Sequence, residues 1–492
     1  MIDSSERNLI LKISQEITDI SDIDSKRNLS RNVRLPAQNT VPPASMEGST
    51  IETCHPSIRL GHVSASAISA ARFTCFWPGA SRRIRRENID MIKRIAAGEL
   101  RIGMFVHDLN CSWVDHPFLF NRVRITSARD LERLLQTGVT HVYIDTTLGA
   151  DSQPGNERES IEREISIAMN EAGSRGASLL PNRPLGEELQ RARNIHRETQ
   201  ALILQLFGDA RLGKAPDLER IEPLVERIGL SLAANAGALL MLTRMKDADQ
   251  YTFQHSVAVG LLLMRFASAA GYGADEVARI GIGGLVHDIG KMFTPDSILN
   301  KPGRLTPAEF DLIKRHPGDG HQLLSKARGV QQEQLDITRQ HHERMDGRGY
   351  PDSRTASEIP AVARMAAIVD VYDALTSDRC YHRGIPPTLA LRRLVEWSGE
   401  HFDTELVHRF VQCIGIYPTG TVVELVSGRI AIVTDQTASA LLAPKLLAVY
   451  DSKKRRTLVP TEISPDGSGQ LPDLILGVTV GSKWGITPED FL

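Results

Sequence analysis

The stretch that decides the fold is IGIGGLVHDIGK, from Ile280 to Lys291. It begins with a run of small and apolar residues that is typical of a buried segment, and it then places His287 and Asp288 side by side. Burying an imidazole or a carboxylate without a partner costs considerable free energy. The stretch therefore predicts a buried polar site inside a helical core.

Further histidines and an aspartate recur in the same helical region. They are His255, His316, His341, His342 and Asp370. Gaps of 32, 29, 25 and 29 residues separate successive positions from His255 through His287, His316 and His341 to Asp370. Each gap has about the length of one helix out and one helix back, so these side chains can return to one level of a bundle. Several buried imidazoles with two buried carboxylates favour a metal site with nitrogen and oxygen ligands.

A single histidine in a helix is usually a surface residue or one already satisfied in the core, so the argument rests on the joint pattern. Its most unusual part is QHHERMDGRGYP, from Gln340 to Pro351. Neighbouring residues on a helix point about 100° apart, so His341 and His342 converge on one site only at a helix end or kink. The glycines that follow predict such an end.

These motifs resemble a known family. HDIGK (His287 to Lys291) resembles the signature of the HD phosphohydrolase superfamily, and HHERMDGRGYP resembles the second signature of its HD-GYP subfamily. The segments at 298–317 and 370–379 are similar to that subfamily as well. The resemblance covers about residues 247–415, roughly a third of the chain. It implies a cyclic-di-GMP phosphodiesterase with two or three non-haem iron or manganese ions.

The resemblance also implies the ligands of two divalent ions. One ion takes His255, His287, Asp288 and Asp370, and the other takes His316, His341 and His342, with Asp288 bridging both. A hydroxide between the ions would open cyclic-di-GMP to pGpG, and further to GMP. Members with three ions carry an acid where this chain has Tyr251, so we expect a dinuclear centre of iron or manganese.

Other residues belong to the substrate side by the same resemblance. Lys291 follows Asp288 by three positions, and it would neutralise phosphate charge or protonate the leaving oxygen; the alternative is a surface lysine. Arg379 would pair with a phosphate; the alternative is a salt bridge on a helix surface. His382 stands where the family often has a basic residue, which affects substrate affinity or its pH dependence.

The glycine-rich turn completes the expected substrate side. Its residues are Gly347, Gly349, Tyr350 and Pro351. The family interpretation makes this turn a surface that faces the substrate or a partner protein, and the alternative is a rigid structural turn.

Three functions remain open from the sequence. The first is an active cyclic-di-GMP phosphodiesterase. The second is a catalytically weak HD-GYP protein that binds cyclic-di-GMP or a partner protein, for which Tyr251 and His382 leave room. The third is a metal phosphohydrolase that acts on another nucleotide. Metal content separates the first two, since a scaffold has no need of two metal ions.

Composition sets broader limits. The 492 residues carry a net charge of -2, which gives no general attraction for nucleic acid. Five scattered cysteines fit a reducing compartment, and the polar first residues do not resemble a signal peptide. The longest apolar run that we identify, Val257–Phe266, is too short to span a membrane. We therefore expect a cytoplasmic protein.

The predicted fold is mainly α: an HD-GYP helical bundle that follows a small α/β module and precedes a small β module. Residues 1–90 are expected to be disordered, 91–150 to form the α/β module and 151–215 a charged linker and helix. Residues 216–415 form the HD-GYP domain and 416–492 the β module. Within the first module, the pattern predicts a helix at 88–100, strands around 101–109 and 141–147 and a helix between them, with His107 and Asp108 on the surface. Ser427-Gly428 predicts a hairpin.

Overall fold

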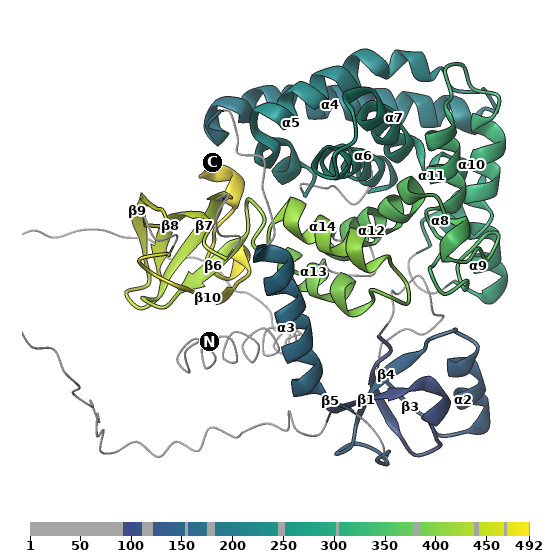
Figure 1. Cartoon of the computed structure of the whole chain (residues 1–492), viewed down its shortest axis with the longest axis horizontal. Helices are drawn as coiled ribbons and strands as arrows, with labels where there is room; N and C mark the ends of the chain where they lie inside the picture. Colours follow the sequence, from purple (N-terminus) through teal and green to yellow (C-terminus); the bar gives the residue numbers. More distant parts are fainter. Residues whose placement is uncertain are drawn as a thin grey trace, which may run out of the picture. The chain divides into compact units, whose positions relative to one another are not determined.

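The structure is a computed structural model. It describes residues 92–110, 122–152, 156–174, 183–244, 251–301, 305–377, 384–436, 442–466 and 470–491. The segment 1–90, which we expected to be disordered, lies outside these residues. The predicted fold class is confirmed, because a helical bundle follows a small α/β region and precedes an antiparallel sheet (Figure 1).

The α/β region is a five-stranded sheet with the order β3-β2-β4-β1-β5. Its elements are β1 (Ile92–Ala96), β2 (Phe105–Asp108), β3 (Val123–Arg124), α2 (Ala128–Leu135), β4 (His141–Asp145) and β5 (Asn156–Glu157). The two predicted strands and the helix between them are therefore confirmed. The helix predicted at 88–100 is wrong for the described part: β1 pairs with β4 on one side and β5 on the other, and this pairing overrides helix propensity.

The expectation that His107 and Asp108 lie on the surface is also wrong. Both are partly buried, and Asp108 forms an ion pair with Arg393. Although burial opposes it, this arginine holds the pKa of Asp108 below its ordinary value. Close by, Trp397 Nε1 donates a hydrogen bond to Asn110 Oδ1 at 2.9 Å. Asp108 thus connects the α/β region to the bundle.

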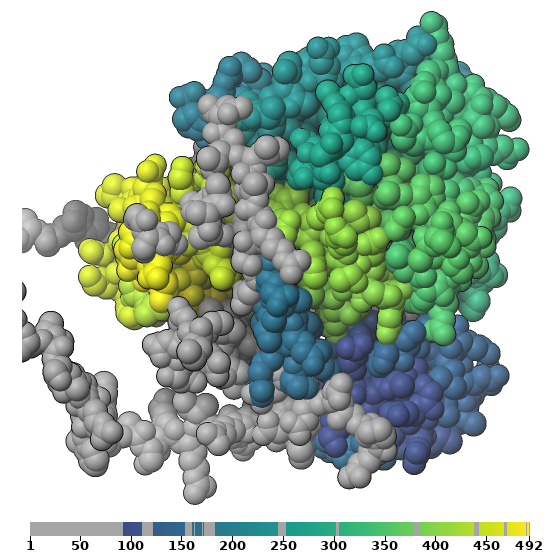
Figure 2. All heavy atoms as spheres, viewed as in Figure 1, coloured from purple at the N-terminus to yellow at the C-terminus, as the bar shows by residue number. Residues whose placement is uncertain are grey.

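The bundle begins with long helices and continues with shorter ones. They are α3 (Arg158–Ser174), α4 (Leu185–Arg211), α5 (Glu222–Leu242), α6 (Tyr251–Ala269), α7 (Ala274–Val286), α8 (Asp296–Leu299), α9 (Pro307–Ile313), α10 (His316–Leu324), α11 (Gln332–Gln340), α12 (Ala361–Thr376), α13 (Pro387–Glu396) and α14 (Thr404–Ile414). Helices α6, α7, α11 and α12 contact one another in a closed ring. The green residues of α9 and α10 form part of the surface in Figure 2.

Glycines allow α6 and α7 to approach closely. A Cβ on Gly284 would lie 2.9 Å from the Cα of Gly260 and 2.8 Å from Leu263 Cδ1. A Cβ on Gly281 would lie 2.2 Å from Met264 Cγ. The small residues of the deciding stretch therefore serve to bring two helices together, and a larger side chain would push them apart.

The C-terminal strands form a second antiparallel sheet with the order β10-β6-β7-β8-β9. They are β6 (Val422–Leu425), β7 (Arg429–Asp435), β8 (Lys445–Asp451), β9 (Arg456–Ile463) and β10 (Ile475–Val478). The predicted hairpin at Ser427-Gly428 is confirmed, because β6 pairs with β7. Apolar residues of this sheet share one core with α6, α12, α13 and α14.

One described helical stretch, Leu218–Leu242, is long and apolar enough to cross a membrane by length and composition alone. This stretch includes α5 and is distinct from the run at Val257–Phe266. Half of its most apolar window is buried inside the protein, as in a core helix, so it is weak evidence for a membrane span.

Candidate metal centre

The ring of helices brings histidines and aspartates from distant parts of the chain to one buried place. Two groups form there, and within each group the candidate ligand atoms lie within 4.8 Å of one another. The first group is Asp288, His316, His341 and His342, and the second is His255, His287 and Asp370. The structure therefore brings together all seven residues that the sequence singled out as ligands.

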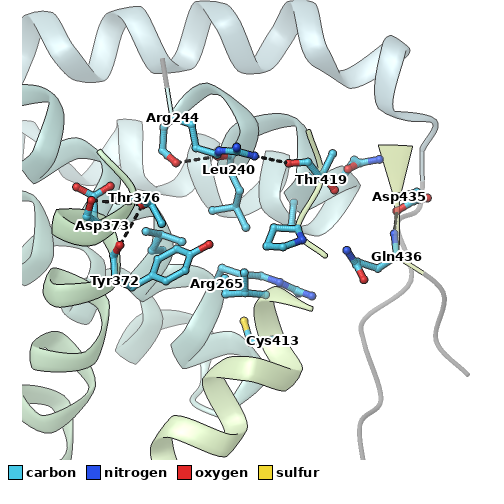
Figure 3. Close-up of a pocket in the computed structure, with 17 residues that line it drawn as sticks. Leu240, Arg244, Arg265, Tyr372, Asp373, Thr376, Cys413, Thr419, Asp435 and Gln436 are labelled. Carbon is cyan, nitrogen blue, oxygen red and sulfur yellow. Dashed lines mark hydrogen bonds between the residues drawn. The ribbon is translucent and has the colours of Figure 1, made fainter. Parts of the chain in front are cut away.

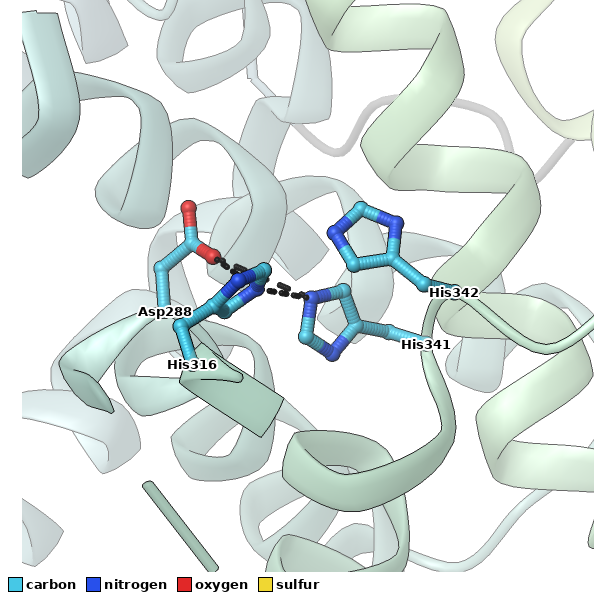
Figure 4. Close-up of side chains that lie close together, drawn as sticks. All are labelled: Asp288, His316, His341 and His342. Carbon is cyan, nitrogen blue, oxygen red and sulfur yellow. Dashed lines mark hydrogen bonds and ion pairs between the residues drawn. The ribbon is translucent and has the colours of Figure 1, made fainter. Parts of the chain in front are cut away.

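Asp288 lies between the two groups. Its Oδ1 contacts His316 Nε2 at 3.2 Å, a contact that is drawn as a dashed line in Figure 4, and its Oδ2 is 3.4 Å from His287 Nε2. The carboxylate thus presents one oxygen to each group. In the second group, Asp370 Oδ1 lies 2.9 Å from His255 Nε2.

Hydrogen bonds on the far side of the rings set which nitrogen faces the centre. Nδ1 of His287 lies 2.8 Å from the carbonyl oxygen of Gly284, and Nδ1 of His316 lies 2.7 Å from that of Ile313. A carbonyl only accepts, so each Nδ1 carries the proton and each Nε2 keeps a lone pair directed at the centre. This is the arrangement of metal-binding histidines.

Asp373 gives His255 the same orientation, and sequence reasoning missed it. Its Oδ2 lies 2.6 Å from Nδ1 of His255, and the carboxylate is buried. The available signal was DVYD, in which Asp373 follows Asp370 by three residues and so lies on the same face of α12.

The electrostatics of the centre suit a cation. Burial, together with the neighbouring His287 and His316, lowers the pKa of His341 to about 3. Burial opposes ionisation of Asp288, yet His287 and Lys291 hold its pKa well below the usual range. A neutral ring and an ionised carboxylate are the forms that bind metals. At His255, by contrast, burial is outweighed by Asp370 and Asp373, which raise the pKa of that imidazole. Within the described residues, His287 Nε2 and Asp288 Oδ1 are buried without a hydrogen-bond partner, and a cation in each group would supply one.

The double histidine lies at a helix end, as predicted. α11 ends at Gln340, and the rings of His341 and His342 follow with centroids 4.1 Å apart.

The glycine of HDIGK, Gly290, has a separate role. A Cβ on Gly290 would lie 2.0 Å from the carbonyl oxygen of His316, so only glycine lets this segment reach the start of α10.

Lys291 lies at the edge of the centre. Its Nζ is 2.5 Å from Asp288 Oδ2, and its side chain is 20% exposed. The ammonium group thus contacts the shared carboxylate and retains some access to solvent.

The glycine-rich turn places an aromatic ring against the centre. Tyr350 stacks on His342 with ring centroids 4.6 Å apart. A Cβ on Gly349 would lie 2.4 Å from the Cα of Glu343, and Gly347 has a φ of +73°. The buried carboxylate of Glu343 accepts the backbone N–H of Asp352 at 2.7 Å, just beyond the cis bond to Pro351. The turn is thus fixed from within, and it carries Tyr350 to the site.

Some predicted features cannot be placed. Arg379 and His382 lie outside the described residues, and so does the side chain of Tyr251. The interpretations attached to them stay predictions.

Comparisons with known proteins agree with this geometry. Residues 243–406 match the HD domain family, and residues 92–221 match a domain of unknown function, DUF3391. The cyclic di-GMP phosphodiesterase PA4108 of Pseudomonas aeruginosa is 40% identical over 401 residues, which cover 81% of this chain and 95% of that protein. A cyclic di-GMP phosphodiesterase of Thermotoga maritima is 37% identical over 35% of this chain and 47% of its own length.

Other relatives differ in the substrate that their names give. The 3'3'-cGAMP-specific phosphodiesterase 1 of Vibrio cholerae is 40% identical over 29% of this chain and 33% of its own length.

Among solved structures, the HDG"Y"P protein Bd1817 of Bdellovibrio bacteriovorus is similar over 65% of this chain and 98% of its own chain, with 19% identity and a TM-score of 0.39.

Proposed function

We propose a function from one premise, that this chain belongs to the HD-GYP family of HD-domain phosphodiesterases. The chain hydrolyses cyclic di-GMP, the substrate named for its relative in Pseudomonas aeruginosa. That relative is matched along nearly its whole length, so the proposal extends to the α/β and β regions as well as to the helical domain.

The observation that carries the proposal is the shared position of Asp288. Two groups of imidazoles meet at this carboxylate, and each group receives one of its oxygens. This supports a pair of divalent ions, iron or manganese, held by His255, His287 and Asp370 on one side and by His316, His341 and His342 on the other. Bound there, such a pair would supply an activated water and charge neutralisation for a phosphodiester.

The protein's own groups support the rest of the reaction. Lys291 would hold a non-bridging phosphate oxygen or give a proton to the leaving sugar oxygen, because its ammonium group already contacts Asp288. Tyr350 offers its ring edge and hydroxyl beside His342. The first product is pGpG, and a second hydrolysis at the same site would give GMP.

Two alternative functions are each supported by a specific observation. The relatives named for 3'3'-cGAMP favour a different cyclic dinucleotide as the substrate. A catalytically weak binding protein is the other alternative, because the residues at Tyr251 and His382 differ from those usual in the family.

The test is hydrolysis by the full chain, purified without oxygen and supplied with iron or manganese. Bound metal and linear products are quantified with cyclic di-GMP, 3'3'-cGAMP and cyclic di-AMP in parallel. We expect two metal ions per chain and pGpG from cyclic di-GMP. Replacing Asp288 by Ala should remove metal and activity together, whereas Asp403→Ala, which removes an aspartate of the α14 N-terminus, should keep both. Two bound ions with no cleavage of any substrate would contradict the proposal.

A further inference from the structure

A pocket that includes none of the proposed ligands lies where the helical bundle meets the first strands of the C-terminal sheet. It is lined by residues of α5, α6, α12 and α14 and by Thr419, Asp435 and Gln436. Figure 3 shows the side chain of Arg265 extending across this pocket toward Gln436, beside Cys413. The proposed function leaves this arginine without a role.

Arg265 is a buried arginine whose charge is unpaired within the described residues. The residue is 5% exposed, and its Nε has no hydrogen-bond partner in that part of the chain. Among the residues that the structure describes, no carboxylate forms an ion pair with its guanidinium. An arginine cannot lose its proton to escape the cost of burial, so a buried unpaired guanidinium is costly unless an anion joins it. The pocket in front of it has room for such an anion.

Further groups at the pocket favour a negative ligand. Arg244 lies at its rim, where it is exposed and donates to the carbonyl oxygen of Thr419 at 3.3 Å. Burial raises the pKa of the Tyr372 hydroxyl, which therefore remains a proton donor.

Two carboxylates also line the pocket, but each has a partner of its own. Asp373 binds Nδ1 of His255 at 2.6 Å. Asp435 lies 3.7 Å from Nζ of Lys445, and burial raises its pKa. Neither carboxylate forms an ion pair with Arg265, so the positive charge of that guanidinium remains available to a ligand.

The side-chain oxygen of Gln436 restricts the chemistry of the ligand further. The amide of Gln436 donates through Nε2 to the carbonyl oxygen of Tyr417, which fixes its orientation and leaves Oε1 buried without a donor. A suitable ligand therefore accepts from Arg265 and also donates to Gln436. Inorganic phosphate does both at neutral pH, since it carries charged oxygens and a P–OH group, and a phosphate monoester does both in its singly protonated form. Sulfate at the same pH has no such proton.

We propose that this pocket is a binding site for a phosphate group, either inorganic phosphate or the phosphate of a small monoester. Arg265 holds its charged oxygens, Gln436 Oε1 accepts its proton, and Arg244 closes the rim. The site lies outside the proposed metal ligands, although Asp373 borders both.

The experiment is calorimetric titration of the full chain at pH 7 and constant ionic strength with inorganic phosphate, sulfate, GMP and guanosine. Asp288→Ala removes the phosphate-attracting metal centre. We expect phosphate to bind both this variant and the wild type, and sulfate to bind at least tenfold more weakly. Tighter binding of GMP than of phosphate, with guanosine silent, would identify a monoester as the ligand; equal affinities would identify inorganic phosphate.

Matched variants locate the site. Arg265→Met should raise the phosphate dissociation constant at least tenfold, whereas Arg409→Met, which removes an exposed arginine of α14, should leave it unchanged. Arg244→Gln changes an exposed residue and provides a second test, with an expected severalfold weakening. Unchanged binding in Arg265→Met, loss of binding in Asp288→Ala, or equal affinity for sulfate and phosphate would each overturn the assignment.

Discussion

Replacing Asp373 by Asn tests whether this carboxylate orients the ring of His255 for metal binding, and it leaves every proposed ligand in place. Asn is nearly isosteric with Asp, and its amide oxygen can still accept a hydrogen bond from His255 Nδ1. The geometry of the 2.6 Å contact is therefore kept, and only the negative charge is lost. Replacing a partner of this kind typically weakens metal affinity by about 10- to 100-fold, which is roughly 1.4 to 2.7 kcal/mol. We expect a loss within that range for the ion beside His255.

The assay is competition for iron or manganese with a chelator of known affinity, without oxygen, followed by hydrolysis of cyclic di-GMP at rising metal concentration. The orientation argument predicts that excess metal restores most of the rate in Asp373→Asn. Asp403→Asn is the matched control, since Asp403 is a partly buried aspartate that is paired with Arg364 at 2.8 Å and belongs to neither ligand group. The reasoning is refuted if metal affinity in Asp373→Asn stays within twofold of the wild type, or if the control loses as much.

Three further changes probe separate parts of the site. Lys291→Ala should keep both metal ions and lower the rate by about 100- to 10,000-fold if the lysine acts as an acid; loss of metal, measured by elemental analysis, would instead assign it a structural role. Gly290→Ala places a methyl group 2.0 Å from a carbonyl oxygen and should lower the free energy of unfolding by about 1 to 3 kcal/mol, measured by denaturant titration. Gly208→Ala, in a helix with nothing within 4 Å, should stabilise by up to about 1 kcal/mol and serves as its control. Tyr350→Ala should raise KM for cyclic di-GMP with metal content unchanged, whereas Tyr350→Phe should retain the stacking on His342; equal KM values for the two variants would contradict a role for the ring.

The strand at Ile92–Ala96 shows where local pattern was insufficient. IKRIA followed by AGE has the composition of a short helix, and the sequence could not reveal that β4 and β5 would take up its backbone hydrogen bonds on both sides. The prediction that Asp108 lies on the surface was wrong for the same reason. Its partner Arg393 lies 285 residues away in the chain, and no local pattern signals a contact at that separation.

The candidate metal centre could be predicted from the sequence because it depends on the types and spacing of its residues. Charged and imidazole side chains inside apolar helices need a shared partner wherever the helices go, and their spacing matched one helix out and one helix back. The helix end before His341 and His342 was accessible too, since neighbouring helical residues diverge and the following glycines interrupt a helix.

The sequence by itself determined the class of fold, the seven residues of the candidate centre and the helix end before His341, because burial cost and helix geometry act on any chain with this pattern. Only the tertiary structure decided how these residues meet. It placed Asp288 between the two groups, brought Asp373 into contact with His255 Nδ1 and buried Arg265 with no counter-charge among the described residues. These features depend on distances between segments far apart in the chain, which packing fixes and local sequence does not encode.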